Sequence, residues 1–145
     1  MRRYALLAAG AVVVALLALT ALFAPLAAPR DPLAMNARAR LAAPSSAHFL
    51  GTDQFGRDVL SRVIHGARIS LGVGLGAVAL SIGAGLALGS LAAMREGAVD
   101  ALVMRTMDVL FAFPAILLAL ALIAVLGSKP RNVVLAIGLV YLPVF

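Results

Sequence analysis

Four long stretches without a charged residue constrain the fold of this chain more than any other feature. They are Tyr4–Pro29, Ile69–Met94, Val109–Ser128 and Asn132–Phe145. Charge in hydrocarbon is costly, and a helix needs about 20 apolar residues to cross about 30 Å of it. The 63% share of hydrophobic residues also exceeds the share of roughly half found in soluble domains. The sequence therefore predicts an all-α membrane protein, and it excludes a disordered chain and a globular enzyme with one water-facing core.

The apolar segments predict three complete membrane spans and part of a fourth. We expect the complete spans at about residues 5–24, 69–93 and 103–127, and the partial one at 133–145. The last segment has 13 residues, which extend about 20 Å as a helix and do not cross. A signal peptide is the alternative for the first segment, but its apolar run exceeds the usual length of about 7–15 residues. Pro114 removes a backbone hydrogen bond and predicts a kink in the third span.

Residues 25–68 connect the first two spans in an irregular part and a helical part. Prolines interrupt the first part, and apolar side chains recur at helical spacing from Asp58 onward. This periodicity predicts an amphipathic helix that lies at the membrane interface and turns into the second span. Asp58 and Arg62 have the four-residue spacing of a helical ion pair.

The net charge of +6 would suggest nucleic-acid binding in a soluble protein. Here the arginines lie in short connections beside apolar spans, where they more often anchor helix ends and contact lipid phosphate. With the N-terminus inside, four basic residues face inward and eight face outward. This count opposes the positive-inside rule, and the charge distribution alone leaves the orientation open.

No arrangement of residues predicts catalysis, a bound cofactor or a metal site. The sequence has no cysteine, and its two histidines, His48 and His65, have no carboxylate at metal-ligand spacing. The pattern from Gly74 to Ala79 fits a dinucleotide fingerprint, but it lies inside an apolar helix and not between a strand and a soluble helix. We therefore do not expect an enzyme.

Small residues spaced along the second span predict close approach by other helices. They are Gly72, Gly76, Ser81, Gly85 and Gly89. In the connection that follows, Asp100 is expected to cap the third helix, and Arg105 to pair with Asp108 at the membrane boundary. A role at a helix end is favoured for these charges over a position facing a cavity.

The segment from His48 to Leu71, HFLGTDQFGRDVLSRVIHGARISL, resembles permease subunits of dipeptide, oligopeptide, nickel and glutathione ABC importers. Segments from Asp100 to Pro114, and from Leu126 to Asn132, are similar to the same family in the same order. The resemblance leaves the roles of the motif residues unassigned. These residues are Gly51, Thr52, Asp53, Gly56, Arg57, Asp58, Arg62, Gly66, Arg68, Asp100, Arg105, Asp108 and Pro114.

The resemblance implies a type I ABC importer permease fold, with residues 1–145 forming the N-terminal part of one transmembrane domain. It implies a bacterial inner-membrane protein with a cytoplasmic N-terminus, and residues 25–68 on the extracytoplasmic side. The implied partners are a homologous second permease, two cytoplasmic ATPases that bind the ATP, and an extracytoplasmic binding protein. Charged motif residues such as Asp53 and Arg57 are then expected to brace the second span in preference to forming a docking surface.

The implied function is ATP-driven import of peptides, nickel chelates, glutathione or similar solutes by alternating access. Family members continue through a fourth span into a loop that docks on the ATPase, and the sequence has no counterpart of that loop. We therefore expect an N-terminal fragment or a truncated reading frame. The alternative is a small assembly or regulatory subunit that binds partners through its glycine-rich helix faces.

Overall fold

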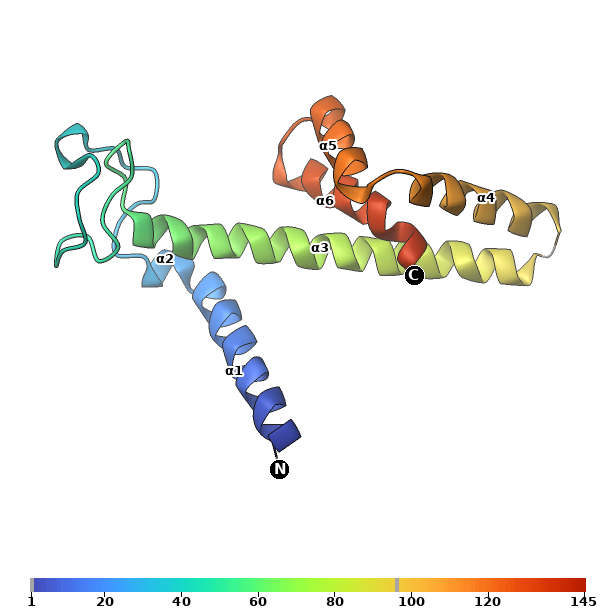
Figure 1. Ribbon diagram of the computed structural model, residues 1–145, viewed down its shortest axis with the longest axis horizontal. Helices are drawn as coiled ribbons and strands as arrows, with labels where there is room; N and C mark the ends of the chain where they lie inside the picture. Colours follow the sequence, from blue (N-terminus) through green and yellow to red (C-terminus); the bar gives the residue numbers. More distant parts are fainter. Residues whose placement is uncertain (1, 96) are drawn as a thin grey trace. The chain divides into compact units, whose positions relative to one another are not determined.

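The computed structural model describes residues 2–95 and 97–145, with side chains from Tyr4 onward. The described residues form helices and no β-strand, with one isolated bridge between Thr52 and Asp58. This confirms the all-α prediction. In chain order the elements are α1 (Arg2–Leu22), α2 (Ala24–Ala27), η1 (Ala37–Ala39), α3 (Val59–Met94), α4 (Ala98–Ala112), α5 (Ala115–Leu126), α6 (Pro130–Tyr141) and η2 (Leu142–Val144) (Figure 1).

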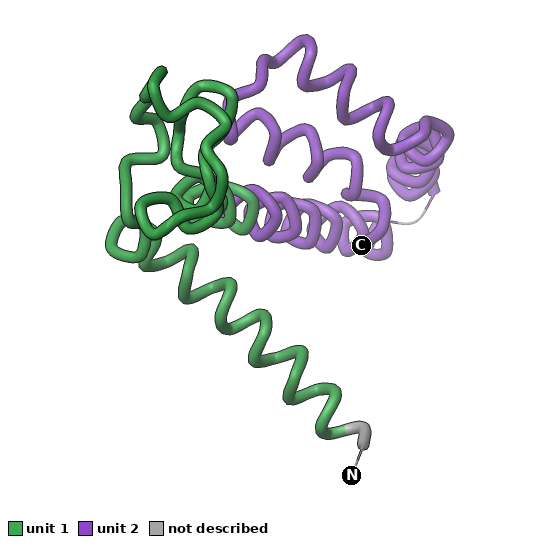
Figure 2. Tube along the Cα trace, turned by 60° about the vertical axis from the view of Figure 1, so that its left-hand side comes forward, with its two compact units in different colours: residues 1–71 green, residues 72–145 purple. Residues whose placement is uncertain are grey.

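The chain divides into two compact units, residues 1–71 and 72–145, and α3 contributes to both (Figure 2). Unit 1 contains α1, the irregular connection and the first turns of α3. Unit 2 contains the rest of α3 together with α4, α5, α6 and η2.

Two helices of the described chain are long and apolar enough to cross a membrane: α1, over Tyr4–Leu22, and α3. A third candidate arises if α4 and α5 are counted as one bent span. The α6 helix is apolar but shorter, as the predicted partial span at 133–145 implies.

The predicted amphipathic helix at 58–68 is present, but it is not a separate element. It forms the first turns of α3, which continues for 36 residues, or about 54 Å at 1.5 Å per residue. The expected turn into the second span is therefore wrong. The sequence explains the continuity, because no proline occurs between Pro44 and Pro114 to interrupt the backbone hydrogen bonds.

The predicted third span, residues 103–127, is divided at Phe113 and Pro114. The α4 and α5 helices meet there at 95°, so the expected kink is a full break. Pro114 has no N–H to donate, and its ring disfavours the helical conformation at Phe113, which is extended with φ −92° and ψ 138°.

In unit 2, α6 and η2 lie against α3 through small residues. The Ser81 hydroxyl lies 2.8 Å from the Gly138 carbonyl oxygen and 2.9 Å from that of Ala77, so its one hydrogen serves both contacts. A Cβ at Gly138 would lie 2.2 Å from Leu80 Cδ2, and one at Gly76 would lie 3.3 Å from the methyl groups of Val134. Glycine at these positions permits the close approach of the two helices.

The other members of the predicted small-residue ridge differ among themselves. A Cβ at Gly85 would lie 3.0 Å from both Leu142 O and Phe145 Cβ. Gly72 and Gly89, in contrast, face open space within 4 Å among the described residues. Among these residues, close contact with α6 and η2 is therefore restricted to Gly76, Ser81 and Gly85.

Candidate functional site

The motif residues from Gly51 to Arg62 gather in unit 1, where the connection folds over the first turn of α3. We call residues 28–58 the α3 cap. Its polar groups are hydrogen-bonded: no buried side-chain nitrogen or oxygen among the described residues lacks a partner. The α3 cap is therefore an ordered structure and not a free loop.

Asp58 immediately precedes α3 and is buried, with 3% of its surface exposed. Its Oδ2 accepts hydrogen bonds from the Ser61 N–H at 2.9 Å and the Ser61 hydroxyl at 2.8 Å, as an N-cap residue does. Its Oδ1 lies 2.9 Å from His48 Nδ1. Burial raises the pKa of Asp58, but the hydrogen bonds from Ser61 and His48 outweigh it, and the pKa is lowered from the ordinary value.

The expected ion pair between Asp58 and Arg62 is wrong. Both carboxylate oxygens of Asp58 are already occupied, and Arg62 instead reaches Asp53. The reason is that Asp58 lies before the helix, so the free N–H groups of the first turn are its nearest donors. The roles of His48 and Ser61 were missed. An aspartate directly before a helical run, as at Asp58, is the sequence signal that indicates the cap.

Asp53 organises the turn that follows it. Its Oδ1 accepts from the backbone N–H groups of Phe55, at 2.8 Å, and Arg57, at 3.0 Å. Its Oδ2 accepts from Arg57 Nε at 2.8 Å and also contacts Arg62. Burial raises the pKa of Asp53, but the N–H donors of Arg57 and Phe55 and the Arg57 guanidinium lower it to about 2.

Gly51 and Gly56 allow two segments of the α3 cap to cross closely. Their φ angles are +72° and +74°, a region that residues with a Cβ rarely adopt. A Cβ at Gly56 would lie 1.8 Å from Asn36 O, and one at Gly51 would lie 2.5 Å from Ala42 O. Between them the buried Thr52 hydroxyl accepts from the Ala42 N–H at 2.8 Å and donates to the Ala39 carbonyl.

The remaining motif residues do not join the α3 cap. On α3, Gly66 has open space around it and Arg68 is exposed. Asp100 lies in the first turn of α4 but makes no side-chain cap bond, so the expected cap is wrong; the N-cap position belongs to Gly97 with φ +85°.

The expected pair of Arg105 and Asp108 is also absent from the described residues. Their ion pairs all lie in unit 1, and are His48–Asp58, Arg57–Asp53 and Arg62–Asp53. Asn132, from the third matching segment, donates to Leu126 O at 2.5 Å and so closes the end of α5.

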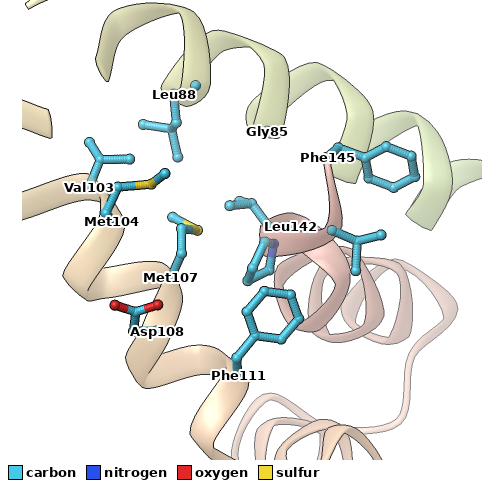
Figure 3. Close-up of a pocket in the computed structure, with 12 residues that line it drawn as sticks. Gly85, Leu88, Val103, Met104, Met107, Asp108, Phe111, Leu142 and Phe145 are labelled. Carbon is cyan, nitrogen blue, oxygen red and sulfur yellow. The ribbon is translucent and has the colours of Figure 1, made fainter. Parts of the chain in front are cut away.

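A cavity of about 340 Å³ lies in unit 2 between α3, α4 and η2 (Figure 3). Among the described residues that line it, Asp108 alone is charged, and Met104, Met107 and Phe111 stand beside it on α4 (Figure 3). A single exposed carboxylate in such a groove can attract a cationic group, but it supplies no acid and base pair.

His48, Asp58 and Ser61 are the residue types of a hydrolase triad, but here the carboxylate lies between the histidine and the serine. The Ser61 hydroxyl donates to Asp58 and not to the imidazole, so the histidine does not activate it. A second cavity of about 350 Å³ borders His48, Arg30, Asp31 and Asp58. In the described part of the chain no three His, Asp or Glu side chains are placed to hold a metal ion.

Comparison with known proteins identifies relatives over most of the chain, although no protein-family model matches it. The chain is 40% identical over 136 residues to the dipeptide transport system permease protein DppC of Alkalihalophilus pseudofirmus, covering 94% of this chain and 45% of that protein. It is 50% identical over 102 residues to the glutathione transport system permease protein GsiD of Pectobacterium atrosepticum, covering 70% and 34%.

A third relative extends the range of transported solutes. The nickel transport system permease protein NikC of Escherichia coli is 39% identical over 128 residues, which cover 88% of this chain and 46% of that protein. The chain thus spans less than half the length of the curated relatives that it matches.

Proposed function

This chain is a homologue of ABC transport permease proteins, and from that premise we propose that it forms part of the membrane-spanning subunit of an importer for peptides or similar small solutes. The observation that carries the proposal is the 40% identity to a dipeptide permease over 94% of the chain. The apolar helices α1 and α3 fit such a subunit. Its relatives are membrane permease components and not enzymes, so catalysis belongs to other subunits.

In this function the chain lies in a bacterial inner membrane, pairs with a second permease and receives energy from two ATPases. An extracytoplasmic binding protein delivers the solute. Transport then proceeds by alternating access between the two permease chains, with ATP bound only by the ATPases. Dipeptides, glutathione and nickel are the solutes named for the relatives.

We further propose that the N-terminus is cytoplasmic and that the α3 cap is extracytoplasmic. The main objection is the basic charge of the outward connection. Asp53 offsets part of that charge, because its carboxylate pairs with both Arg57 and Arg62. Paired arginines inside a folded segment contribute less to orientation than free ones in a short loop.

Deletion of the gene tests the proposal. We expect the deletion strain to lose uptake of one labelled solute among a dipeptide, glutathione and nickel, and a plasmid copy to restore it. Uptake of all three at the wild-type rate, in medium where the gene is expressed, would contradict the proposal.

A non-transport assembly subunit is the second candidate. Gly72 favours it, because a Cβ there would meet open space on α3, which would admit a partner helix. Purification from membranes distinguishes the two functions. ATPase subunits that co-purify with the chain support transport, whereas a stable homo-oligomer without them supports the assembly role.

A further inference from the structure

Two arginines meet around one carboxylate on the surface of the α3 cap, and a third contacts the backbone of the adjacent residue. Arg57 and Arg62 both contact Asp53 Oδ2. Arg40 donates from Nε to the Gln54 carbonyl at 2.8 Å, next to them in the chain. The surface formed here is called the basic patch, and it consists of Arg40, Leu41, Phe55, Arg57 and Arg62. Since Asp53 balances one of the three guanidinium groups, the basic patch keeps an excess of two positive charges.

The apolar members of the basic patch are held outward. Leu41 is 73% exposed and has φ +50°, a conformation that costs a leucine free energy. Its N–H donates to the Asp53 carbonyl at 3.1 Å, which holds the backbone of Leu41 in this conformation. Phe55 is 46% exposed and carries the Arg57 guanidinium 4.7 Å above its ring. Exposed apolar and aromatic groups beside arginine are typical of a membrane–water interface.

The position of the basic patch along α3 matches the level of lipid headgroups. The uncharged part of α3 begins at Ile69, and Arg62 precedes it by about 10 Å of helix at 1.5 Å per residue. The headgroup layer extends roughly 5–8 Å beyond the hydrocarbon on each side. A flexible arginine side chain spans the remaining distance.

We propose that the basic patch binds the phosphate groups of anionic phospholipids in the leaflet where α3 begins. The inference rests on the proposed crossing of the bilayer by α3, but not on its direction. The guanidinium N–H groups that do not contact Asp53 or Gln54 donate to phosphate oxygens. Leu41 and Phe55 enter the apolar edge of the headgroup layer, so the α3 cap is fixed on the membrane surface.

Site-specific labelling tests the contact directly, because the natural chain has no cysteine. The variant Gln54→Cys carries a fluorophore beside the basic patch, and Ala47→Cys carries it on an exposed turn of the same cap. Both are placed in nanodiscs of phosphatidylglycerol or phosphatidylcholine that contain headgroup spin labels. We expect quenching at position 54 to be stronger in phosphatidylglycerol, and quenching at position 47 to be equal in the two lipids.

Titration of phosphatidylglycerol into phosphatidylcholine discs measures the contribution of each arginine. Arg40→Gln should weaken the lipid response at position 54 about fivefold, the effect of one basic residue near an anionic surface. Arg131→Gln removes an exposed charge from unit 2 and should leave the response unchanged. Circular dichroism in detergent confirms that each variant is folded.

Three results would overturn the inference. Equal quenching at position 54 in both lipids would exclude recognition of anionic headgroups. No quenching there would place the basic patch in water, available to an acidic protein. An equally weakened lipid response at position 54 in Arg131→Gln would indicate an effect of the net charge of the chain and not binding at the basic patch. The crossing of the bilayer by α3 is tested separately with a fluorophore at Gly83→Cys, where the added side chain meets open space. Spin labels on the lipid acyl chains should quench this fluorophore. Absence of that quenching would contradict the proposed membrane function itself.

Discussion

Asp53 and Asp58 hold the α3 cap through different sets of donors. Asp53 binds the turn that follows it and two arginines, whereas Asp58 joins the turn at His48 to the start of α3. The sequence identified both residues as motif members. It did not indicate their partners, because helical spacing described Arg62 and Asp58 as neighbours while the fold placed Arg62 beside Asp53.

Acid should loosen the turn at Asp53. The folded pKa of about 2 lies below the ordinary value of 3.8, so the unfolded chain binds more protons between these values. The resulting stability is complete above about pH 4 and is lost as the pH falls toward 2. Thermal unfolding in detergent from pH 5 to pH 2 measures this loss. In Asp53→Asn the same interval should show a smaller change, and an unchanged slope in that variant would contradict the assignment.

Gly56→Ala should destabilise the α3 cap. A Cβ at this position would lie 1.8 Å from Asn36 O, and the backbone has φ +74°. Strain of this kind costs about 1–3 kcal/mol. Gly66→Ala is the matched control on α3, where the added Cβ meets open space and a helical alanine contributes about 0.5–1 kcal/mol. Chemical unfolding of both variants should therefore give shifts of opposite sign.

At the scale of elements, the uncharged stretches predicted where helices lie but not how long each continues. The α3 helix begins ten residues before its uncharged part and passes without interruption into it. The predicted third span, in contrast, is divided between α4 and α5. Pro114 marks the position of the break in the sequence. The size of the bend, 95°, is not contained in the hydrophobic periodicity.

Pro114→Ala should reduce the angle between α4 and α5. Alanine restores the missing N–H and removes the restriction on Phe113, so the two helices can continue into one another. Spin labels at Arg105→Cys and Leu120→Cys, both exposed, should move farther apart. Pro130→Ala is the control, because proline is well tolerated in the first turn of a helix, where Pro130 begins α6. An unchanged distance in Pro114→Ala would assign the bend to packing instead.

Gly138→Ala should weaken the contact between α3 and α6. The new Cβ would lie 2.2 Å from Leu80 Cδ2, so Leu80 must change its rotamer or the helices must separate. Overpacking of this kind costs about 1–3 kcal/mol. Gly89→Ala adds the same methyl group to α3 at the edge of the cavity, where no other atom lies within 4 Å of it. Thermal unfolding in detergent should show a loss only for Gly138→Ala, and equal midpoints would indicate that α6 is not packed as described.

For the whole molecule, hydrophobic composition and charge placement were sufficient to predict the fold class. The order of the apolar segments also agrees with the described helices. The α3 cap could not be predicted, because its crossing joins backbone groups of residues 36–42 to those of 51–56. Contacts between irregular segments leave no periodicity in the sequence. The basic patch could not be predicted for the same reason, because Arg40 and Leu41 join it from an earlier irregular segment.

The hydrogen bonds of the α3 cap bear on the order of events during synthesis. Among the described residues they join positions between Ala24 and Arg62, and none of them involves α4, α5 or α6. The cap can therefore close once the first turns of α3 have been released, before the later helices are complete. A nascent chain released only as far as the end of unit 1 would already carry the closed cap, before any part of unit 2 has folded.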